Sequence, residues 1–248
     1  MYEKKTVFCY ALAVGIVLLC WQAASLWLAL PVIPRPAQVI EVLPRVFAGE
    51  MALHAAYSLW RIAAGLVLAI AVGVPLGVLM GYCPRCDRIL APLVYVTYPV
   101  PKIALLPIVM LLAGLGETSK IWMLFLIIVF QVVVAVRDAV KGIPKETFDS
   151  LYSLGAGFWP VFREILWPAA LPHFLTAVRV AMATAVSVLF FTETFGTQYG
   201  MGYFIMDAWL RVNYIDMYGG IMALSLMGMA LFASLDALER IFCRWQMK

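Results

Sequence analysis

The chain has 248 residues, of which 65% are hydrophobic and only 13% are charged, and its mean hydropathy is +0.95. Soluble domains carry roughly a quarter charged residues, so this composition excludes a soluble globule and predicts an integral membrane protein. At about 20 apolar residues per spanning helix, the length has room for about six spans and none for a soluble catalytic domain. The net charge of +4 is too small to indicate a nucleic-acid-binding protein.

Six apolar runs of spanning length follow one another along the chain. The first resembles a signal peptide in its basic start, but its apolar stretch is longer than a cleavable one, so we expect an uncleaved anchor helix. We predict an all-α integral membrane protein, with one helix and an outer connection in residues 1–56 and a core of about five helices in residues 57–248. The predicted spans cover residues 6–30, 57–82, 89–115, 121–136, 174–195 and 217–235.

Two spans carry small residues at helical spacing. Such residues fall on one stripe of a helix and let a second backbone approach closely. The pattern predicts close helix packing and names no function. The stripe in the second span is Gly65, Ala69, Gly73, Gly77 and Gly81, and a weaker one in the fifth span is Ala177, Ala181 and Ala185.

The distribution of basic residues predicts the orientation of the spans. Cytoplasmic loops of membrane proteins hold an excess of Lys and Arg near the span ends. Eleven of the 18 Lys and Arg residues fall on one predicted side, and four (Arg35, Arg45, Lys120 and Arg211) fall on the other. Both termini are therefore expected on the cytoplasmic side, which agrees with an even number of spans.

The segment 137–173, between the fourth and fifth spans, lies on the predicted cytoplasmic side. Pro144 is placed to open a short helix and Gly155 to end it, and a second short helix is expected over residues 161–167. Phe148, Leu151 and Tyr152, with Leu154 as a further candidate, would form an apolar stripe on the first helix, with nothing in this chain obliged to cover it. Such a face meets either the bilayer surface or another protein.

The order and spacing of residues in this segment resemble the Glu-Ala-Ala loop in membrane subunits of binding-protein-dependent ABC importers. Asp-Ser-Leu stands where the family has Glu-Ala-Ala, so the acid is shorter and two small residues are lost. The subgroup suggested imports nitrate, sulfonates, taurine or bicarbonate. The resemblance rests on Asp149 to Leu151, Gly155, Ile165 and Pro168 in this segment, and elsewhere on Pro34 to Val39, His54, Ser58, Leu59, Arg61, Gly65, Pro99 to Lys102, Ala104, Pro107, Gly114 to Glu117, Ser119, Lys120, Ser153 to Ala156, Pro168 to Pro172, Glu193, Gly200 to Gly202 and Ile205.

The resemblance implies a type I ABC importer permease, with residues 57–248 as the permease core, in the inner membrane of a bacterium. It implies three protein partners: a pair of ATPase subunits, an extracytoplasmic solute-binding protein and a second copy of this chain. The short helix in the segment 137–173 would be the coupling helix that docks in a cleft of the ATPase. The residues implied in this coupling are Glu146, Phe148, Asp149, Leu151, Tyr152, Gly155 and Ala156.

The sequence contains no Gly-x-x-x-x-Gly-Lys-Ser/Thr loop, which is the standard cradle for nucleotide phosphates. The nearest glycine-rich stretch, residues 114–120, has the wrong spacing. We therefore expect ATP and Mg²⁺ to be used by the separate ATPase, and this chain to be no enzyme and to hold no cofactor.

Ionisable residues at membrane depth are costly and indicate function by default. Lys102 lies in a Pro-interrupted run where a broken helix can line a cavity, so it is either a path-lining cation for an anionic substrate or a snorkelling or salt-bridged residue. Glu193 closes the fifth span and is either part of an outer gate or a solvated span end. We take Lys102 and Glu193 as candidates for the translocation path. For Arg61 and Arg179 we expect anchoring at the interface.

Cys83 and Cys86 form a CxxC in a short predicted turn. Two thiols are only half of the ligands of a structural zinc site, and no second pair or nearby histidine completes the set. His54 and His173 lie at opposite predicted membrane faces. We therefore predict no metal site.

Two other classes of protein compete with the ATP-driven permease. A secondary transporter or channel would need no ATPase, but it predicts an internal repeat or an intramembrane carboxylate relay, and neither is evident. An intramembrane enzyme would require clustered catalytic groups, and the spans hold no His pair, no HExxH and no Asp dyad. The sequence therefore favours a permease for a small polar or anionic solute.

Overall fold

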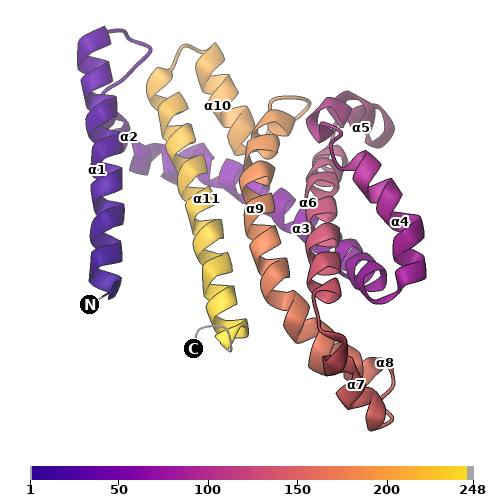
Figure 1. Cartoon of the computed structure of the whole chain (residues 1–248). Helices are drawn as coiled ribbons and strands as arrows, with labels where there is room; N and C mark the ends of the chain where they lie inside the picture. Colours follow the sequence, from indigo (N-terminus) through magenta and orange to yellow (C-terminus); the bar gives the residue numbers. More distant parts are fainter. Residues whose placement is uncertain (1, 245–248) are drawn as a thin grey trace.

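The computed structural model describes the backbone of residues 2–244 and the side chains of residues 12–244, and every regular element in this part is a helix. The long helices α1, α11, α9 and α6 rise side by side (Figure 1). We name the two ends of this bundle after the short helices α7 and α10; α1 begins and α11 ends at the α7 end. The helices are α1 (Tyr2–Leu28), α2 (Pro36–Val46), α3 (Ala52–Tyr82), α4 (Pro84–Thr97), α5 (Leu106–Ala113), α6 (Glu117–Lys141), α7 (Lys145–Ser153), α8 (Phe158–Val161), α9 (Trp167–Glu193), α10 (Met201–Leu210) and α11 (Tyr214–Phe242).

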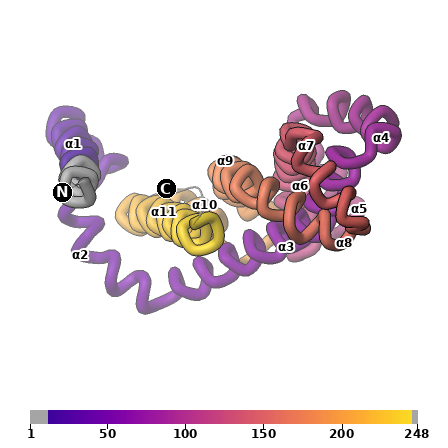
Figure 2. Tube along the Cα trace, turned by 60° about the horizontal axis from the view of Figure 1, so that its bottom comes forward, coloured from indigo at the N-terminus to yellow at the C-terminus, as the bar shows by residue number. Residues whose placement is uncertain are grey.

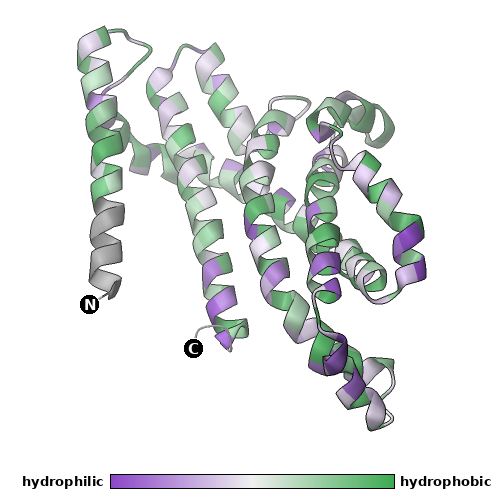
Figure 3. Cartoon of the chain, viewed as in Figure 1, coloured by the Kyte–Doolittle hydropathy of each residue, from purple (hydrophilic) through white to green (hydrophobic). Residues whose placement is uncertain are grey.

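Within the described residues, four stretches are long and apolar enough to cross a membrane, and a fifth qualifies as a bent pair of helices. Helix α1 is a further apolar helix, whose part with described side chains, Leu12–Leu28, is shorter than a full span. Hydrophobic residues follow the length of these helices, whereas many hydrophilic ones lie at α7 and at the ends of α4 and α11 that are nearer to α7 (Figure 3). The predicted fold class, an all-α membrane protein of about six spans, is confirmed with α1 counted as the sixth.

The second predicted span begins earlier than its apolar run indicates. Helix α2 continues through a π-helical turn (Phe47–Met51), with a kink at Gly49, directly into α3. Together they form one arc that passes across α11 and α9 (Figure 2). The domain boundary predicted after residue 56 falls inside α3, and the division into an N-terminal part and a permease core remains a prediction.

The third predicted span, residues 89–115, is two helices instead of one. Pro99 and Pro101 have no backbone N–H to continue the helical hydrogen bonds, so α4 ends at Thr97 with Tyr98 as its last helical-conformation residue,. A 3-10 turn (Lys102–Leu105) follows, and the second helix leaves at 82° to the first. The broken helix expected around Lys102 is confirmed, and we call this turn the elbow.

The segment 137–173 is not the long loop that the sequence indicates. Helix α6 continues to Lys141, so Arg137 lies within it. The short helix expected over residues 161–167 is continuous with the fifth span through α8 and a π-helical turn (Phe162–Leu166). Val161 and Leu166 are fully buried against the core, and this packing holds the extension of α9 in place.

The glycine stripe on α3 packs against α6, and the close packing predicted from it is confirmed. A Cβ atom added to Gly65 or Gly77 would lie 2.6 or 2.7 Å from the Cβ of an α6 side chain, which is Val136 for Gly77. The weaker stripe on α9 reaches the same core, where Ala181 and Ala185 are fully buried. Because α3 and α9 both pack on α6, α6 is the central helix of the core.

We predict that Gly77→Ala destabilises the protein by about 1–3 kcal/mol, because the added methyl group overpacks the α3–α6 contact. Gly228→Ala, in α11, is the matched control, since no atom lies within 4 Å of its added Cβ. The measurement is the unfolding midpoint of each purified variant in detergent. Equal midpoints for the two variants would contradict this account of the packing.

Candidate functional site

The short helix α7 begins and ends where the sequence indicates. Pro144 precedes its first residue with extended backbone (φ −59°, ψ 141°). Gly155 follows with a positive φ of 73°, which a residue with a side chain rarely adopts,. The Ala156 N–H donates to the Leu151 carbonyl at 3.1 Å and closes the end of the helix,. Both predicted boundaries are confirmed.

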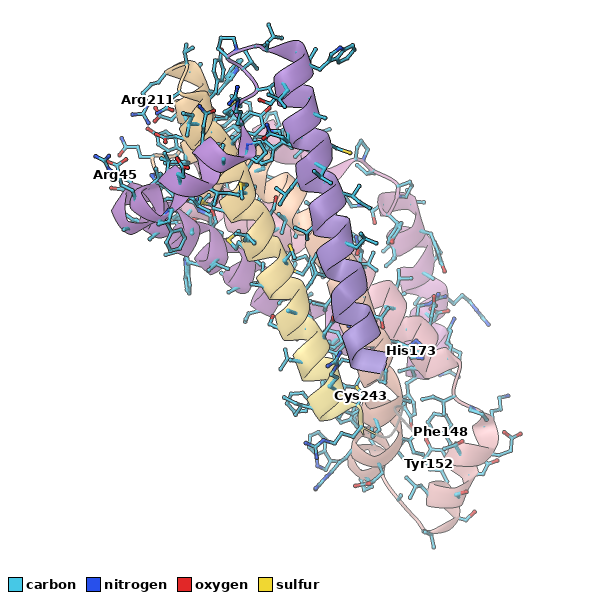
Figure 4. All side chains as sticks on the ribbon, turned by 90° about the vertical axis from the view of Figure 1, so that its left-hand side faces the viewer. Arg45, Phe148, Tyr152, His173, Arg211 and Cys243 are labelled. Carbon is cyan, nitrogen blue, oxygen red and sulfur yellow. The ribbon has the colours of Figure 1, made fainter. Side chains whose placement is uncertain are left out.

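The apolar face of α7 is covered by this chain, contrary to the prediction that nothing covers it. Phe148 and Leu151 pack against the core, and Phe148 lies 6.3 Å from the Tyr82 ring between centroids. The Tyr152 hydroxyl lies 2.5 Å from the Tyr82 hydroxyl. In Figure 4, Phe148 and Tyr152 project from α7 toward the rest of the bundle. The apolar spacing was read correctly, but the sequence did not show that the end of α3 reaches this face.

The opposite face of α7 and the start of α8 are open. Glu146 and Asp149 are exposed, and Leu154 and Trp159 are 82% and 68% exposed. We call these four residues the α7–α8 surface. Two acids beside two large apolar side chains suit a protein partner better than water alone, because the apolar groups gain from being covered.

At the α10 end, the Arg61 guanidinium is fully buried and uses all five of its N–H donors,. It donates to both Glu117 oxygens at 2.5 and 2.6 Å and to Glu193 Oε1 at 2.7 Å. The remaining donors reach the Tyr199 carbonyl at 2.8 Å and the Thr197 hydroxyl at 3.2 Å. The expectation that Arg61 anchors α3 at the membrane interface is wrong, because its charge is neutralised inside the protein.

Glu193 completes this buried network, and its side chain is 0% exposed. It accepts hydrogen bonds from the Ser58 hydroxyl and from the Gly202 N–H, the latter at 2.9 Å. Gly200 has a φ of 123°, and an added Cβ would lie 2.4 Å from the Glu193 carboxyl carbon. Glu193 is therefore no solvated span end. In this conformation it ties α3, α9 and α10 together, and its place in the translocation path remains a prediction.

Lys120 is also buried, although its position in an outer loop was predicted. It lies in the first turns of α6, is 1% exposed and donates to three carbonyls, those of Leu115, Gly116 and Gly196, at 3.0 to 3.2 Å. With Arg61 it balances the charges of Glu117 and Glu193. We call these four charged residues the buried ion network.

Two other arginines join helices through ion pairs. Arg137 donates to Asp87 at the start of α4 and to the Tyr95 hydroxyl at 3.0 Å. Arg179 pairs with Asp236 and Glu239 of α11. Interfacial anchoring of Arg179 was predicted, and instead it binds α9 to α11. These pairs neutralise charge where the helices pack.

Lys102 is like Lys120 in that no ion pair in the part of the chain with described side chains includes it. It differs from Lys120, which is 1% exposed, in lying beside a cavity. Its ammonium donates to the Thr97 carbonyl at 3.0 Å and to the Tyr98 carbonyl. A cavity of about 250 Å³ adjoins it, lined also by Gln131 and Thr184. Its predicted place beside a cavity is confirmed, whereas its role remains a prediction.

Cys83 and Cys86 stand at the start of α4, where the Cys86 N–H donates to the Cys83 sulfur at 3.4 Å. The hydrogen bond from the Cys86 thiol lowers the pKa of the Cys83 thiol. Among the residues searched for metal ligands, no group of three or more His, Cys, Asp or Glu is placed to hold an ion. Two thiols alone do not make a structural zinc site.

Two contributors to these sites, Ser58 and His54, are not among the predicted site residues. Ser58 donates to Glu193 of the buried ion network, and His54 Nδ1 accepts from the Gly200 N–H at 3.1 Å. His54, Ser58 and Arg61 follow helical spacing and continue the glycine stripe, so three polar residues on a packing face were an available signal. Tyr82, which packs against α7, lies 70 residues before Tyr152 in the sequence, and no local pattern indicated that the two would meet.

Long apolar helices, one of them broken at the proline elbow, and the short helix α7 between two of them define a polytopic helical membrane protein. The model of the family described as binding-protein-dependent transport system inner membrane component matches residues 73–247. This chain belongs to that family. It is the membrane-spanning permease subunit of an ABC importer and a multi-pass protein of the inner membrane.

The relatives agree on the family and differ in the solute they are named for. The taurine transport system permease protein TauC of Escherichia coli is 32% identical over 91% of this chain and 84% of its own length. The formylaminopyrimidine transport permease protein ThiX of Halalkalibacterium halodurans is 29% identical, with 92% of each chain covered. An inward-facing structure of the MetNI methionine ABC transporter has a TM-score of 0.66 at 20% identity, covering 76% of this chain and 94% of that one, which shows the shared fold.

We predict that Arg61→Met destabilises the protein by about 3–5 kcal/mol, because it leaves the buried Glu193 carboxylate without its cation,. Arg211→Met, which breaks an exposed pair with Asp207, is the control and should cost at most about 1 kcal/mol,. Unfolding midpoints in detergent measure both. Adding Glu193→Leu to Arg61→Met should recover part of the loss, and a further additive loss would show that the two residues act independently.

Proposed function

We propose that this permease imports a small sulfonate that an extracytoplasmic binding protein delivers, driven by ATP hydrolysis in a separate subunit. The observation that carries the choice of an anion is Lys102, a cation beside a cavity with no carboxylate partner among the described side chains. The likeness to TauC supports a sulfonate. The likeness to ThiX, named for a different kind of solute, means that family membership alone does not choose the substrate.

The α7–α8 surface is the proposed docking site of the ATPase, in which ATP and Mg²⁺ would be bound. Glu146, Asp149 and Leu154 point outward, whereas Phe148 and Tyr152 join α7 to α3. A movement of the ATPase against the outer face of α7 would therefore be transmitted to α3 through Tyr82. This divides the residues assigned to coupling into those that contact the partner and those that transmit its movement.

The same proposal includes the orientation of the chain in the membrane and its pairing with a second copy. The α7 end, where α1 begins and α11 ends, faces the cytoplasm, which the excess of basic residues on that side supports,. The α10 end faces the binding protein. Polar residues on one face of α6 and α9, such as Gln131 and Thr184, open onto cavities that one copy does not enclose, and a second copy would close them into a path.

Leu154→Asp with Asp149→Lys is expected to reduce co-purification of the ATPase at least tenfold while leaving the unfolding midpoint of the permease unchanged. Both side chains are exposed, so their replacement affects a partner and not the fold. Phe148→Ala is the contrasting variant, because it should lower the midpoint of the permease itself by removing a packed ring. Normal recovery of the ATPase with the double variant would overturn the docking assignment.

Vesicles that contain the permease with its ATPase and binding protein should take up labelled taurine or a small alkanesulfonate only when ATP is present. Uptake is measured by filtration against vesicles without ATP. Uptake by the permease alone, without ATP, would contradict the proposed function and favour a secondary transporter.

A further inference from the structure

The elbow holds its lysine by an arrangement that leaves part of the ammonium free. The proline break leaves the carbonyls at the end of α4 with few N–H partners, one of which is the Val100 N–H that donates to the Thr97 carbonyl at 3.3 Å. A cation at a helix C-terminus binds such carbonyls. Lys102 Nζ donates to two of these, Thr97 and Tyr98, and has three donors in all,. One N–H and most of the positive charge are left for another partner, because the carbonyls offer only partial charges.

The surroundings of the ammonium are apolar except on one side. Nζ lies 5.3 Å from the centroid of the Tyr98 ring and 4.9 Å from that of Phe130. The adjoining cavity of about 250 Å³ is bounded by apolar side chains and by two further polar ones, Gln131 and Thr184. Among the described residues neither has a side-chain hydrogen-bond partner, and each brings a donor to the cavity.

The cavity continues a polar stripe that runs toward the α7 end. Gln131 and Asp138 are seven residues, about two helical turns, apart on α6, so they share one helix face. His173 and Thr184 are eleven residues, about three turns, apart on α9 and share a face for the same reason. Asp138, His173 and Thr176 line a second cavity of about 670 Å³ between the same two helices. Polar side chains on a spanning helix face water or protein and avoid lipid, so this stripe marks the side where solute passes.

We propose that Lys102, Gln131 and Thr184 form a binding site for the oxyanion head of a small organic anion midway along the path. The inference rests on the proposed function, since a sulfonate offers three acceptor oxygens to the three donors. A free ammonium, an amide and a hydroxyl around one cavity complement a single negative charge, and the rings of Tyr98 and Phe130 accommodate the apolar part of the solute. Placed at the elbow, the site lies where the two halves of the broken span meet.

A role confined to capping α4 makes a different prediction. Lys102→Gln keeps an amide donor for the carbonyls but removes the charge, whereas Lys102→Arg keeps both. If the ammonium binds the solute, Lys102→Gln should raise the KM for taurine uptake at least tenfold with the complex intact, and Lys102→Arg should restore most of the loss. If it only caps the helix, both variants should transport like the unchanged protein.

A second measurement does not depend on the transported solute. In membranes that hold the complete complex, Thr184→Cys is treated with a sulfonate-bearing methanethiosulfonate and with its trimethylammonium counterpart, and the parent protein supplies the background from the other cysteines. The ratio of anionic to cationic rates should fall at least threefold when Lys102→Gln is added. Thr176→Cys, two turns away on the same helix face, is the control and should show a much smaller change.

These outcomes separate the two proposals. If the unchanged complex takes up no sulfonate but the reactivity ratio falls as stated, the choice of substrate is wrong and the anion site stands. If the ratio does not respond to Lys102→Gln, or if neither reagent reaches Thr184→Cys, the anion site is overturned whatever the complex transports.

Discussion

The close contact between α3 and α6 is the constraint on which the rest of the structure depends. Glycine or alanine at every fourth position leaves one face of α3 with almost no side chains, so the two backbones approach until a Cβ added to a glycine would overlap side chains of α6,. That same face carries Arg61 near the α10 end and leads to Tyr82 at the α7 end. The stripe therefore places a buried cation against its carboxylates and a tyrosine hydroxyl against α7.

Charge inside this protein is almost everywhere paired across helices. Arg61 with Glu193, Arg137 with Asp87 and Arg179 with Glu239 each join segments far apart in sequence, which neutralises charge and fixes which helices are neighbours. Lys120 and Lys102 are held by carbonyls instead. Lys120 is enclosed by the protein, whereas Lys102 adjoins a cavity, and in a permease that cavity makes its charge available to a solute.

Much of the fold followed from the sequence because the bilayer limits what the chain can do. Apolar runs of spanning length, the proline break at the elbow and the boundaries of α7 at Pro144 and Gly155 are local signals, and the structure confirms them. The predicted loop 137–173 was wrong because polarity marks where a chain leaves the membrane and not where a helix ends. Helix α6 and the extension of α9 continue past that point, held by packing.

The sequence by itself determined the class of protein, because composition and periodicity report what each segment tolerates as its surroundings. It also determined the family, through motifs that keep their order along the chain. Only the tertiary structure decided what the charged residues do, since Arg61, Lys120 and Glu193 look like span-end residues until their partners appear. Those partners come from other helices, and no local pattern encodes which helix face will meet which.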